Sequence, residues 1–320
     1  MRSTRKYLSN RLIRLDSVEP RDDVLADVIS ATLLRNVVYR RIEGGAPWGF
    51  RLEQKARAAF YVVARGSGLI EVDGQKPIAL SSGDVVLLPQ GAAHVLRDAP
   101  TTTPEVACQG THARGSATPR IGGKGAPIAL VSGFFELGGT PPPLLARLPA
   151  VVCLSGGDPA VALTVQQIIT ESTTAAAASI LVVQRLADVL FVQVLRWLIS
   201  HKPCKHGVAA LADPAIHRAL AELHGSIAHD WTVAELAKHV GLSRSGFAAR
   251  FASAVGEPPL QYLARWRIAR AAELLRGTDQ GIAEIAAQVG YESVPSFTRA
   301  FKRWQGENPG AYRKLQAVVP

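Results

Sequence analysis

The sequence predicts a two-domain α+β protein. In this fold class an N-terminal β-barrel with following helices precedes a C-terminal all-helical domain, in which a long helix joins two helix-turn-helix units. The length of 320 residues suits about two domains of ordinary size. Short apolar runs between turn residues fill the first part of the chain, and one helical motif occurs twice in the last third.

Residues from about 22 to 135 have the pattern of short β-strands. Apolar runs at 59–64, 69–72 and 85–88 are separated by turns that contain Gly, Ser and Asp. Strands of this length at even spacing are typical of a sandwich or a barrel. The stretch 109–125, which is rich in Gly, Ser, Thr and Arg, is expected to be a loop.

Helical spacing replaces this pattern from Pro159 to Ser200. Apolar residues there recur at intervals of three and four, and Arg185, Asp188 and Arg196 interrupt the most apolar stretch. Each charge would cost several kcal/mol inside a bilayer. The stretch is therefore predicted to be a buried amphipathic helix, and no membrane partner is expected.

Charge and cysteine content restrict the function classes only loosely. The formal net charge of +10 favours an anionic partner, yet residues 211–320 carry 13 basic and 10 acidic residues. The basic extension 1–21 is expected to be disordered, and it lacks the apolar segment of a secretory signal. Three separated cysteines without a CxxC pair argue against a disulfide framework and fit a reducing cytosol.

Two segments of the last third, 231–251 and 281–301, repeat one pattern. Each has an Ala followed four residues later by Gly, and each ends in Phe-x3-Phe. In a helix-turn-helix the Ala faces the second helix, where a larger side chain would push the helices apart, and the Gly takes the positive φ angle of the turn. The matching residues are Ala237, Gly241, Phe247 and Phe251 in the first segment and Ala286, Gly290, Phe297 and Phe301 in the second.

Capping residues and a long uninterrupted stretch complete this pattern. Thr232 with Glu235 three residues later has the form of a capping box, and Ser243 can cap the following helix. Between Pro259 and Gly277 the chain contains no helix breaker. A helix of about 17 residues is about 25 Å long, so it can hold two recognition helices about one DNA turn, near 34 Å, apart.

The last 110 residues or so resemble the DNA-binding domain of the AraC/XylS family. The resemblance includes the ending Gly290-Tyr-Glu-Ser, Phe297-x-Arg-x-Phe301-Lys and Pro309-Gly-Ala-Tyr312-Arg313. It implies a sequence-specific transcription regulator that binds double-stranded promoter or operator DNA. A cytoplasmic, nucleoid-associated activator that contacts RNA polymerase is the corresponding expectation.

The same resemblance bears on the helices between the two domains. In such regulators these helices can pair two copies of the chain, and paired subunits suit paired half-sites. A homodimer is therefore expected, with packing inside one chain as the alternative for these helices.

DNA contacts are expected on the faces of the two recognition helices that lie opposite their Phe residues. An Arg can bind a guanine edge or a phosphate, and Ser is a less discriminating contact. Family members usually carry larger polar residues where this chain has Ala248, Ala249, Val294 and Pro295, so DNA shape is expected to supply part of the specificity. The predicted DNA-binding residues are Ser243, Arg244, Ser245, Ala249, Arg250, Ser293, Ser296, Arg299, Lys302 and Arg303.

The segment 83–98 resembles the second cupin motif through its spacing Gly83-x5-Pro89-x-Gly91-x2-His94. The likeness to cupin-type sensor domains of AraC-type regulators covers about residues 22–155. It implies a cupin-like β-barrel that responds to a small molecule or a stress signal. His94 is interpreted as a hydrogen-bonded residue or an effector contact, and Tyr61 as a core residue or part of the cavity lining.

No cofactor and no metal centre are expected. The first cupin motif normally supplies two His and a Glu, but the corresponding strand at 60–68 has no His, and one His is too few for a site with about three protein ligands. A cupin-type metalloenzyme that carries a DNA-binding module is the disfavoured alternative, so the chain is not expected to be an enzyme. An architectural or RNA-binding protein is the other alternative, which sequence-specific footprinting would separate.

Two clusters that contain cysteine complete the candidate sites. His201, Cys204 and His206 have metal-like spacing without an obvious fourth ligand. Cys108, near His112, is the candidate for a redox-reactive thiol, with an inert thiol as the alternative.

These inferences divide the chain into four parts. They are the basic extension (1–21), the cupin-like sensor domain (22–155), a helical connector with the dimerisation region and a linker (156–207), and the double helix-turn-helix domain (208–320).

Overall fold

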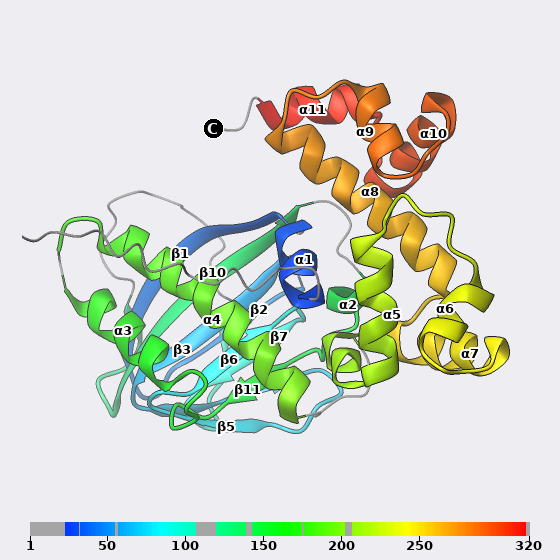
Figure 1. The fold of residues 1–320 in the computed structure, drawn as a ribbon. Coiled ribbons are helices and arrows are strands. Elements are labelled where there is room, and N and C mark those ends of the chain that lie inside the picture. Colours follow the sequence, from blue (N-terminus) through cyan, green and yellow to red (C-terminus); the bar gives the residue numbers. More distant parts are fainter. Residues whose placement is uncertain are drawn as a thin grey trace, which may run out of the picture.

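The computed structural model describes residues 23–31, 33–54, 57–106, 120–138, 143–174, 176–201 and 207–317. Two β-sheets with covering helices form the N-terminal part, and the helices from α5 onward form the C-terminal part (Figure 1). The basic extension 1–21 lies outside the described residues.

The β-strands of the described residues lie in two sheets. The larger has the order β11-β6-β3-β10-β1-β9 and consists of β1 (Leu33–Gly45), β3 (Ala58–Arg65), β6 (Val85–Leu88), β9 (Arg120–Gly122), β10 (Pro127–Gly138) and β11 (Val152–Leu154). The smaller has the order β5-β4-β7-β2-β8 and consists of β2 (Gly49–Leu52), β4 (Ser67–Val72), β5 (Ile78–Ser81), β7 (His94–Arg97) and β8 (Glu105–Val106).

Alternate residues of the larger sheet face opposite sides. In β3, Ala59, Tyr61 and Val63 share a core with the smaller sheet, whereas Phe60 and Val62 belong to a second core shared with helices. This period of two explains the continuous apolar run of the strand, since both of its faces are covered. The expected cupin-like β domain is confirmed. Its described strands form two facing sheets rather than one closed barrel.

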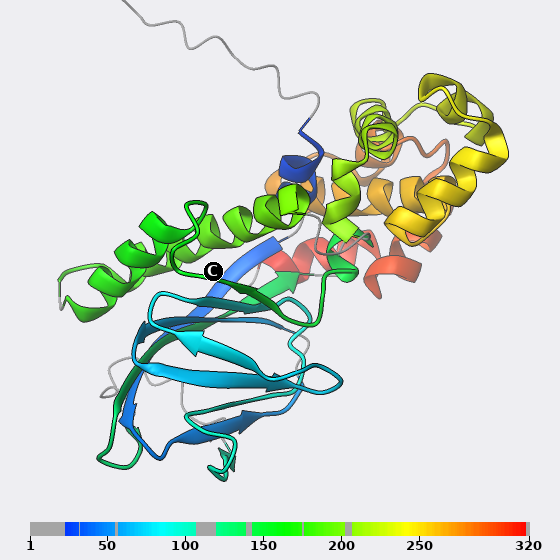
Figure 2. The same cartoon turned by 90° about the horizontal axis from the view of Figure 1, so that it is seen from below.

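Helices α3 (Ala162–Thr173) and α4 (Ser179–His201) lie along one side of the sheets (Figure 2). The helical spacing predicted for this region is confirmed, because the buried residues of α4 recur every three or four positions: Val183, Ala187, Leu190, Phe191, Val194, Leu195 and Leu198. Phe191 lies against Phe135 of β10, with ring centroids 5.0 Å apart. No helix in the described part of the chain combines the length and apolar character that crossing a membrane requires.

Two local expectations are wrong. Residues 24–31, expected among the strands, form the helix α1 (Val24–Ala31), in which Val24, Leu25 and Val28 are buried on one side. Within the expected loop 109–125, residues 120–122 pair in parallel with the end of β1 and form β9.

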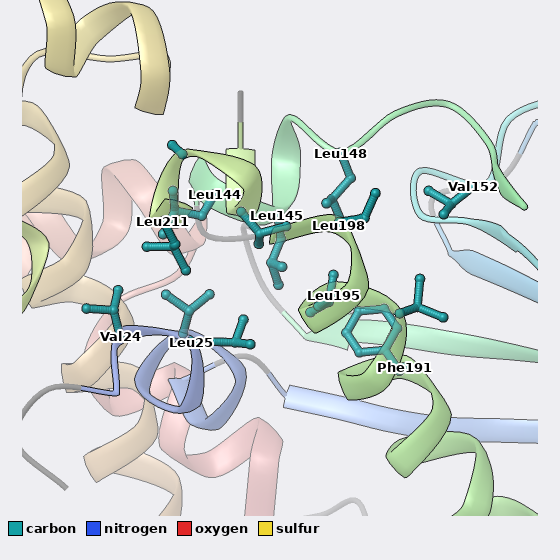
Figure 3. Packing of buried hydrophobic residues seen from close by; sticks show 14 of the residues in the cluster. Val24, Leu25, Leu144, Leu145, Leu148, Val152, Phe191, Leu195, Leu198 and Leu211 are labelled. Atoms are coloured by element: carbon teal, nitrogen blue, oxygen red, sulfur yellow. The ribbon is translucent and has the colours of Figure 1, made fainter. Parts of the chain in front are cut away.

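One buried core joins the N-terminal part to the first C-terminal helices. Figure 3 shows residues from α1, from α4, from the short helix α2 (Pro143–Ala146) and from the 3-10 helix η2 (Gly207–Ala212) in this core. The same cluster continues into Ile216, Phe247 and Phe251 of the C-terminal part. The N-terminal cupin-like domain and the first helix-turn-helix unit therefore share their apolar packing.

The C-terminal helices follow the predicted repeat. They are α5 (Pro214–Gly225), α6 (Val233–His239), α7 (Arg244–Val255), α8 (Pro259–Gly277), α9 (Ile282–Gln288), α10 (Val294–Gln305) and α11 (Pro309–Ala317). The 19 residues of α8 span about 28 Å. Its first half, with Tyr262 and Trp266, packs in the shared core, and its second half, with Ile268 and Leu275, packs in a separate core with α9 to α11.

Candidate nucleic-acid interface

The first helix-turn-helix unit has the capping box and the turn that its sequence predicts. The Thr232 hydroxyl accepts a hydrogen bond from the Glu235 backbone N–H at 3.2 Å, and the Thr232 backbone N–H donates to Glu235 Oε2 at 2.8 Å. Gly241 has a φ angle of +70° in the turn, and Ala237 is buried in the core.

The second unit reproduces the turn without the cap. Gly281 stands at the position that corresponds to Thr232 and offers no side-chain hydrogen bond to α9. Gly290 has a φ angle of +85°, and Ala286 is buried. The common features of the two units are therefore the small buried residue and the turn glycine, as the repeat predicts.

Each recognition helix begins at an exposed serine. The Ser243 hydroxyl accepts from the Gly246 backbone N–H at 3.2 Å, and the Ser293 hydroxyl accepts from the Ser296 backbone N–H at 3.4 Å. Backbone N–H groups at such helix N-termini are suitable phosphate donors. The two serines thus take equivalent positions in the two units.

The faces opposite the buried Phe pairs are exposed in both helices. On α7 this face carries Ser245 and Ala249, and on α10 it carries Arg299, Lys302 and Arg303. These five predicted DNA-binding residues therefore lie on two equivalent outer faces. The face of the first helix is small and uncharged at these positions, whereas the face of the second is strongly basic.

The other predicted DNA-binding residues of these helices either have a partner within the protein, as Arg250 and Ser296 do, or lie at the start of a helix, as Arg244 does. Arg250 Nε donates to Asp213 Oδ2 at 2.7 Å, and Asp213 is also the cap of α5. Burial raises the pKa of Asp213, but the Arg250 guanidinium and two backbone N–H groups hold it below its usual value. Ser296 accepts from Arg299 Nη2 at 3.2 Å, and Arg244 is exposed at the start of α7.

A buried histidine links α1 of the sensor domain to the first unit. His224 Nδ1 lies 3.0 Å from Asp27 Oδ2, its Nε2 lies 2.7 Å from the Tyr262 hydroxyl, and its ring stacks on Trp266 with centroids 3.8 Å apart. Burial lowers the pKa of His224, although the Asp27 carboxylate opposes this. The ring is therefore neutral near pH 7, with Nδ1 donating to Asp27 and Nε2 accepting from Tyr262.

Sequence reasoning missed this link between the domains. Asp27 and His224 are separated by 197 positions in the chain, and no local pattern connects them. The i, i+4 spacing of Tyr262 and Trp266 on α8 is the one local signal, because it places two aromatic rings on the same side of a helix.

In the sensor domain, Tyr61 of β3 and His94 of β7 form a buried pair between the sheets. The Tyr61 hydroxyl lies 2.8 Å from His94 Nε2, and His94 Nδ1 lies 2.7 Å from the Ala92 carbonyl oxygen. Burial lowers the pKa of His94 and raises that of Tyr61, so both side chains are neutral near pH 7. His94 is hydrogen-bonded as expected, and its role as an effector contact stays a prediction.

A hollow of about 460 Å³ lies beside Trp48. Its lining consists of Pro47, Trp48, Gly49, Thr101, Thr102, Thr103, Glu105 and Gly122. Three aromatic rings contact one another from this hollow to the core. The centroids of Trp48 and Phe50 are 6.4 Å apart, and those of Phe50 and Tyr61 are 6.3 Å apart. The hollow is thus connected to Tyr61 through packed aromatic side chains.

The cysteines and metal-like residues offer little chemistry in the described part of the chain. Cys153 of β11 is half-buried, and burial with the nearby Asp84 carboxylate raises the pKa of its thiol to about 12. Cys108, Cys204 and His206 lie outside the described residues. Among the described residues, no three His, Cys, Asp or Glu side chains gather as a metal site would require.

Comparison with known proteins gives consistent matches over both parts of the chain. Residues 23–200 match the Cupin family, and residues 236–315 match a helix-turn-helix domain family. An AraC-like transcription regulator of Streptomyces lividans is 39% identical over 302 residues, which cover 91% of this chain and 98% of that protein. Another AraC-like transcription regulator, from Streptomyces antibioticus, is 37% identical over 299 residues, which cover 91% of this chain and 98% of that protein.

The C-terminal part of this chain is also similar to a solved structure. The DNA-binding domain of AdpA, solved in complex with a target DNA, is 31% identical over 33% of this chain and 96% of that chain, with a TM-score of 0.32.

Proposed function

This chain belongs to the AraC family of transcription regulators, and we propose that it controls promoters by binding one operator through both of its recognition helices. Membership makes it a DNA-binding transcription regulator rather than a cupin enzyme. The observation that carries the proposal is the equivalent exposure of α7 and α10 in two copies of one motif, at the two halves of a single helix α8.

The proposed DNA-binding residues divide by their chemistry. Arg299 binds a base edge or a phosphate, and Lys302 and Arg303 neutralise phosphates. Ser245 and Ala249 let α7 approach the groove closely, because neither adds bulk. The other proposed contacts, at the helix N-termini and beside them, are Ser243, Arg244, Arg250, Ser293 and Ser296. Arg250 reaches DNA only by giving up its ion pair with Asp213.

Selection from a random pool of DNA duplexes tests this function directly. The full chain is expected to enrich a motif with two parts, and the triple change of Arg299, Lys302 and Arg303 to Ala is expected to abolish the enrichment. Lys76→Ala is the control, because Lys76 is an exposed basic residue between β4 and β5 of the N-terminal part. Equal binding of all duplexes, or of RNA, would contradict the proposal and support an architectural or RNA-binding role.

The sensor domain receives a small-molecule or stress signal in this proposal. The hollow beside Trp48 is supported as the entry site by the row of rings that leads to Tyr61 and His94. Tyr61→Phe removes the hydroxyl that bonds His94 and keeps the ring. It is expected to change the response of a promoter to the signal and to leave the affinity of the signal-free protein for DNA unchanged.

A second copy of the chain is the proposed partner of the outer face of α3 and α4. Five apolar side chains of these two helices are exposed, namely Leu163 (75%), Ile180 (62%), Leu181 (52%), Val182 (41%) and Val189 (47%). A two-fold axis along this face would bury the same patch from both copies. Leu181→Glu is expected to convert dimers to monomers in sedimentation equilibrium. Leu315→Glu, at an apolar residue of α11 that is 56% exposed, is expected to have no effect.

The protein is also proposed to activate transcription by contacting RNA polymerase, in the cytoplasm at the nucleoid. This part of the proposal is based on membership of the family. In single-round transcription with purified polymerase, the full chain is expected to increase transcript from a promoter that carries the selected motif. A decrease would identify a repressor instead.

A further inference from the structure

Arg267 lies in the middle of α8, and its guanidinium bridges the two helix-turn-helix units. Its Nε donates to the Ile227 carbonyl oxygen at 2.9 Å, its Nη2 to that of His229 at 2.9 Å, and its Nη1 to that of Gly290 at 3.0 Å. Ile227 and His229 belong to the loop between α5 and α6 of the first unit, and Gly290 belongs to the turn between α9 and α10 of the second. One rigid, planar group thus makes three hydrogen bonds to the backbones of both units.

The loop that Arg267 holds is fixed in the first unit. Trp231, at its end, is 7% exposed, and its Nε1 donates to the Ser226 carbonyl oxygen at 3.1 Å. The Trp231 ring meets the ring of His239 in α6 edge-on, with centroids 5.3 Å apart. The loop therefore cannot shift without moving a buried tryptophan, and a bond to this loop is a bond to the body of the first unit.

The turn between α9 and α10 can lie close to Arg267 because it contains Gly290. A Cβ atom on Gly290 would lie 2.8 Å from Ala228 Cα and 2.8 Å from Arg267 Cζ. The corresponding Gly241 of the first unit would place its Cβ in open space, with nothing within 4 Å. Gly290 thus serves the turn and also the contact between the units, whereas Gly241 serves the turn alone.

We propose that Arg267 is a positioning residue that sets the spacing and mutual orientation of the two recognition helices. This inference rests on the proposed function, in which both units bind one operator. The covalent connection through α8 limits the distance between the units, and each unit packs on its own half of α8. The three hydrogen bonds of Arg267 add a direct link between the two backbones, and a rigid link raises the effective concentration of the second unit at its own subsite.

Arg265 forms a second connection between the two units, near the C-terminal end of α10. Arg265 of α8 donates to Glu257 Oε2 at 3.2 Å, just after α7, and its guanidinium lies 5.0 Å from the ring centroid of Trp304 in α10. Arg265→Ala is therefore expected to add to the effect of Arg267→Ala. Arg270→Ala is the matched control, because the ion pair of Arg270 is with Glu273 in α8 itself.

The DNA test measures how strictly the protein requires one spacing between subsites. The probe is the duplex that the wild-type full chain selects from a random pool, with its two subsites mapped by footprinting. We expect Arg267→Ala to weaken binding of this duplex about tenfold and to weaken binding of a duplex with one subsite scrambled less than about twofold. Insertion of one base pair between the subsites should cost the wild type much affinity and the variant little.

A distance measurement tests the same inference without DNA. Spin labels at the exposed positions Ala234 in α6 and Ala287 in α9, with the three native cysteines replaced by Ser, report the separation of the two units by pulsed electron resonance. We expect a narrow distribution for the wild type and Arg270→Ala, and a broad one for Arg267→Ala. Arg267→Lys, which keeps the charge but can satisfy fewer carbonyl groups, should lie between them.

The two tests separate failure of this inference from failure of the proposed function. If no duplex is selected, the proposed function fails, and the distance distribution still tests the bridge. An unchanged distribution in Arg267→Ala, or a penalty for the inserted base pair that persists in this variant, overturns the inference. A variant that melts well below the wild type is replaced by Arg267→Lys, to which the same criteria apply.

Discussion

The two helix-turn-helix units share one motif, but they are embedded in the molecule in opposite ways. The core of the first unit continues into the sensor domain, whereas the second unit has a core of its own. At the end of α7, Gly256 lies against the Arg147 side chain of the sensor domain, but the equivalent Gly306 of α10 has nothing within 4 Å of its Cβ position. The first unit is thus the one that contacts the N-terminal domain directly.

The outer faces of the two recognition helices differ in the same sense. The basic residues Arg299, Lys302 and Arg303 gather on α10, while the equivalent positions on α7 carry Ala249, Ala252 and Ser253. Charge supplies most of the affinity of a protein for any DNA, and a close fit to the groove supplies discrimination. The second unit thus presents the more basic outer face, and the first unit is the one that packs on the N-terminal domain.

The largest expected effects come from removing a buried Phe ring from the core of each unit. Phe251→Ala and Phe301→Ala each remove a fully buried ring, which costs about 3–5 kcal/mol. Because the core of Phe251 is shared, its loss should lower hydrogen-exchange protection in α1 and α4 as well as in α7. The loss of Phe301 should lower protection in α9 to α11 and leave the sensor domain as it is. Equal spread of the two effects would remove the distinction between the units.

Operator affinity should divide unequally between the recognition helices. Arg299→Ala is expected to weaken operator binding by about 1–3 kcal/mol. Ser245→Ala, on the equivalent face of α7, should cost less than about 1 kcal/mol because a neutral hydrogen bond is weaker. Gel-shift titrations at fixed salt measure both. If Ser245→Ala costs as much as Arg299→Ala, the affinity is divided equally between the two recognition helices, which contradicts the prediction.

The sensor contact should respond to mutation and to acid in the first unit alone. Asp27→Ala removes an acceptor from the buried His224, which should weaken docking of α1 by about 1 kcal/mol. Because the pKa of docked His224 lies below its usual value of 6.5, the undocked state takes up more protons as the pH falls below about 6.5. Docking should therefore be strongest above that pH and weaken below it.

Hydrogen exchange of α1 and α5 at pH 7.5 and 5.5 measures this effect. The wild type should lose protection in these helices at the lower pH, and Asp27→Ala should already have lost part of it at the higher pH. Helix α10 serves as the internal control, since it has no contact with His224. A parallel loss in α10 would show general acid destabilisation instead.

The smallest expected difference concerns the helix caps. Thr232→Ala removes the capping box of α6 and should destabilise the first unit by about 1 kcal/mol. Gly281→Ser offers α9 a cap where it has none, and should stabilise the second unit by a few tenths of a kcal/mol. Thermal unfolding followed by circular dichroism can rank the two variants. A destabilised Gly281→Ser variant would mean that this glycine has another role.

Periodicity and turn chemistry explain how much of this architecture is readable from the sequence. The repeat of small residue, turn glycine and paired Phe predicts both units, because each feature is local and has one geometric reason. The helix α1 was missed because its eight residues are too few to establish a helical period beside a long β-rich region.

The contacts between distant segments are not readable in this way. The bridge of Arg267 and the group around His224 join residues that no local period connects, and their carbonyl partners carry no sequence signal. The proposed division near residue 207 also stays a prediction, since the apolar core extends across it. The exposed faces of the recognition helices follow from the Phe period, but the ion pair that occupies Arg250 does not.

Hydroxyl-radical footprinting of the full chain on its selected operator tests whether both recognition helices bind one duplex. We expect two protected regions on one face of the duplex, with their centres about 10–10.5 base pairs apart, and loss of the region under α10 when Arg299, Lys302 and Arg303 are replaced by Ala. A single protected region, or protection without dependence on the operator sequence, would contradict the proposal.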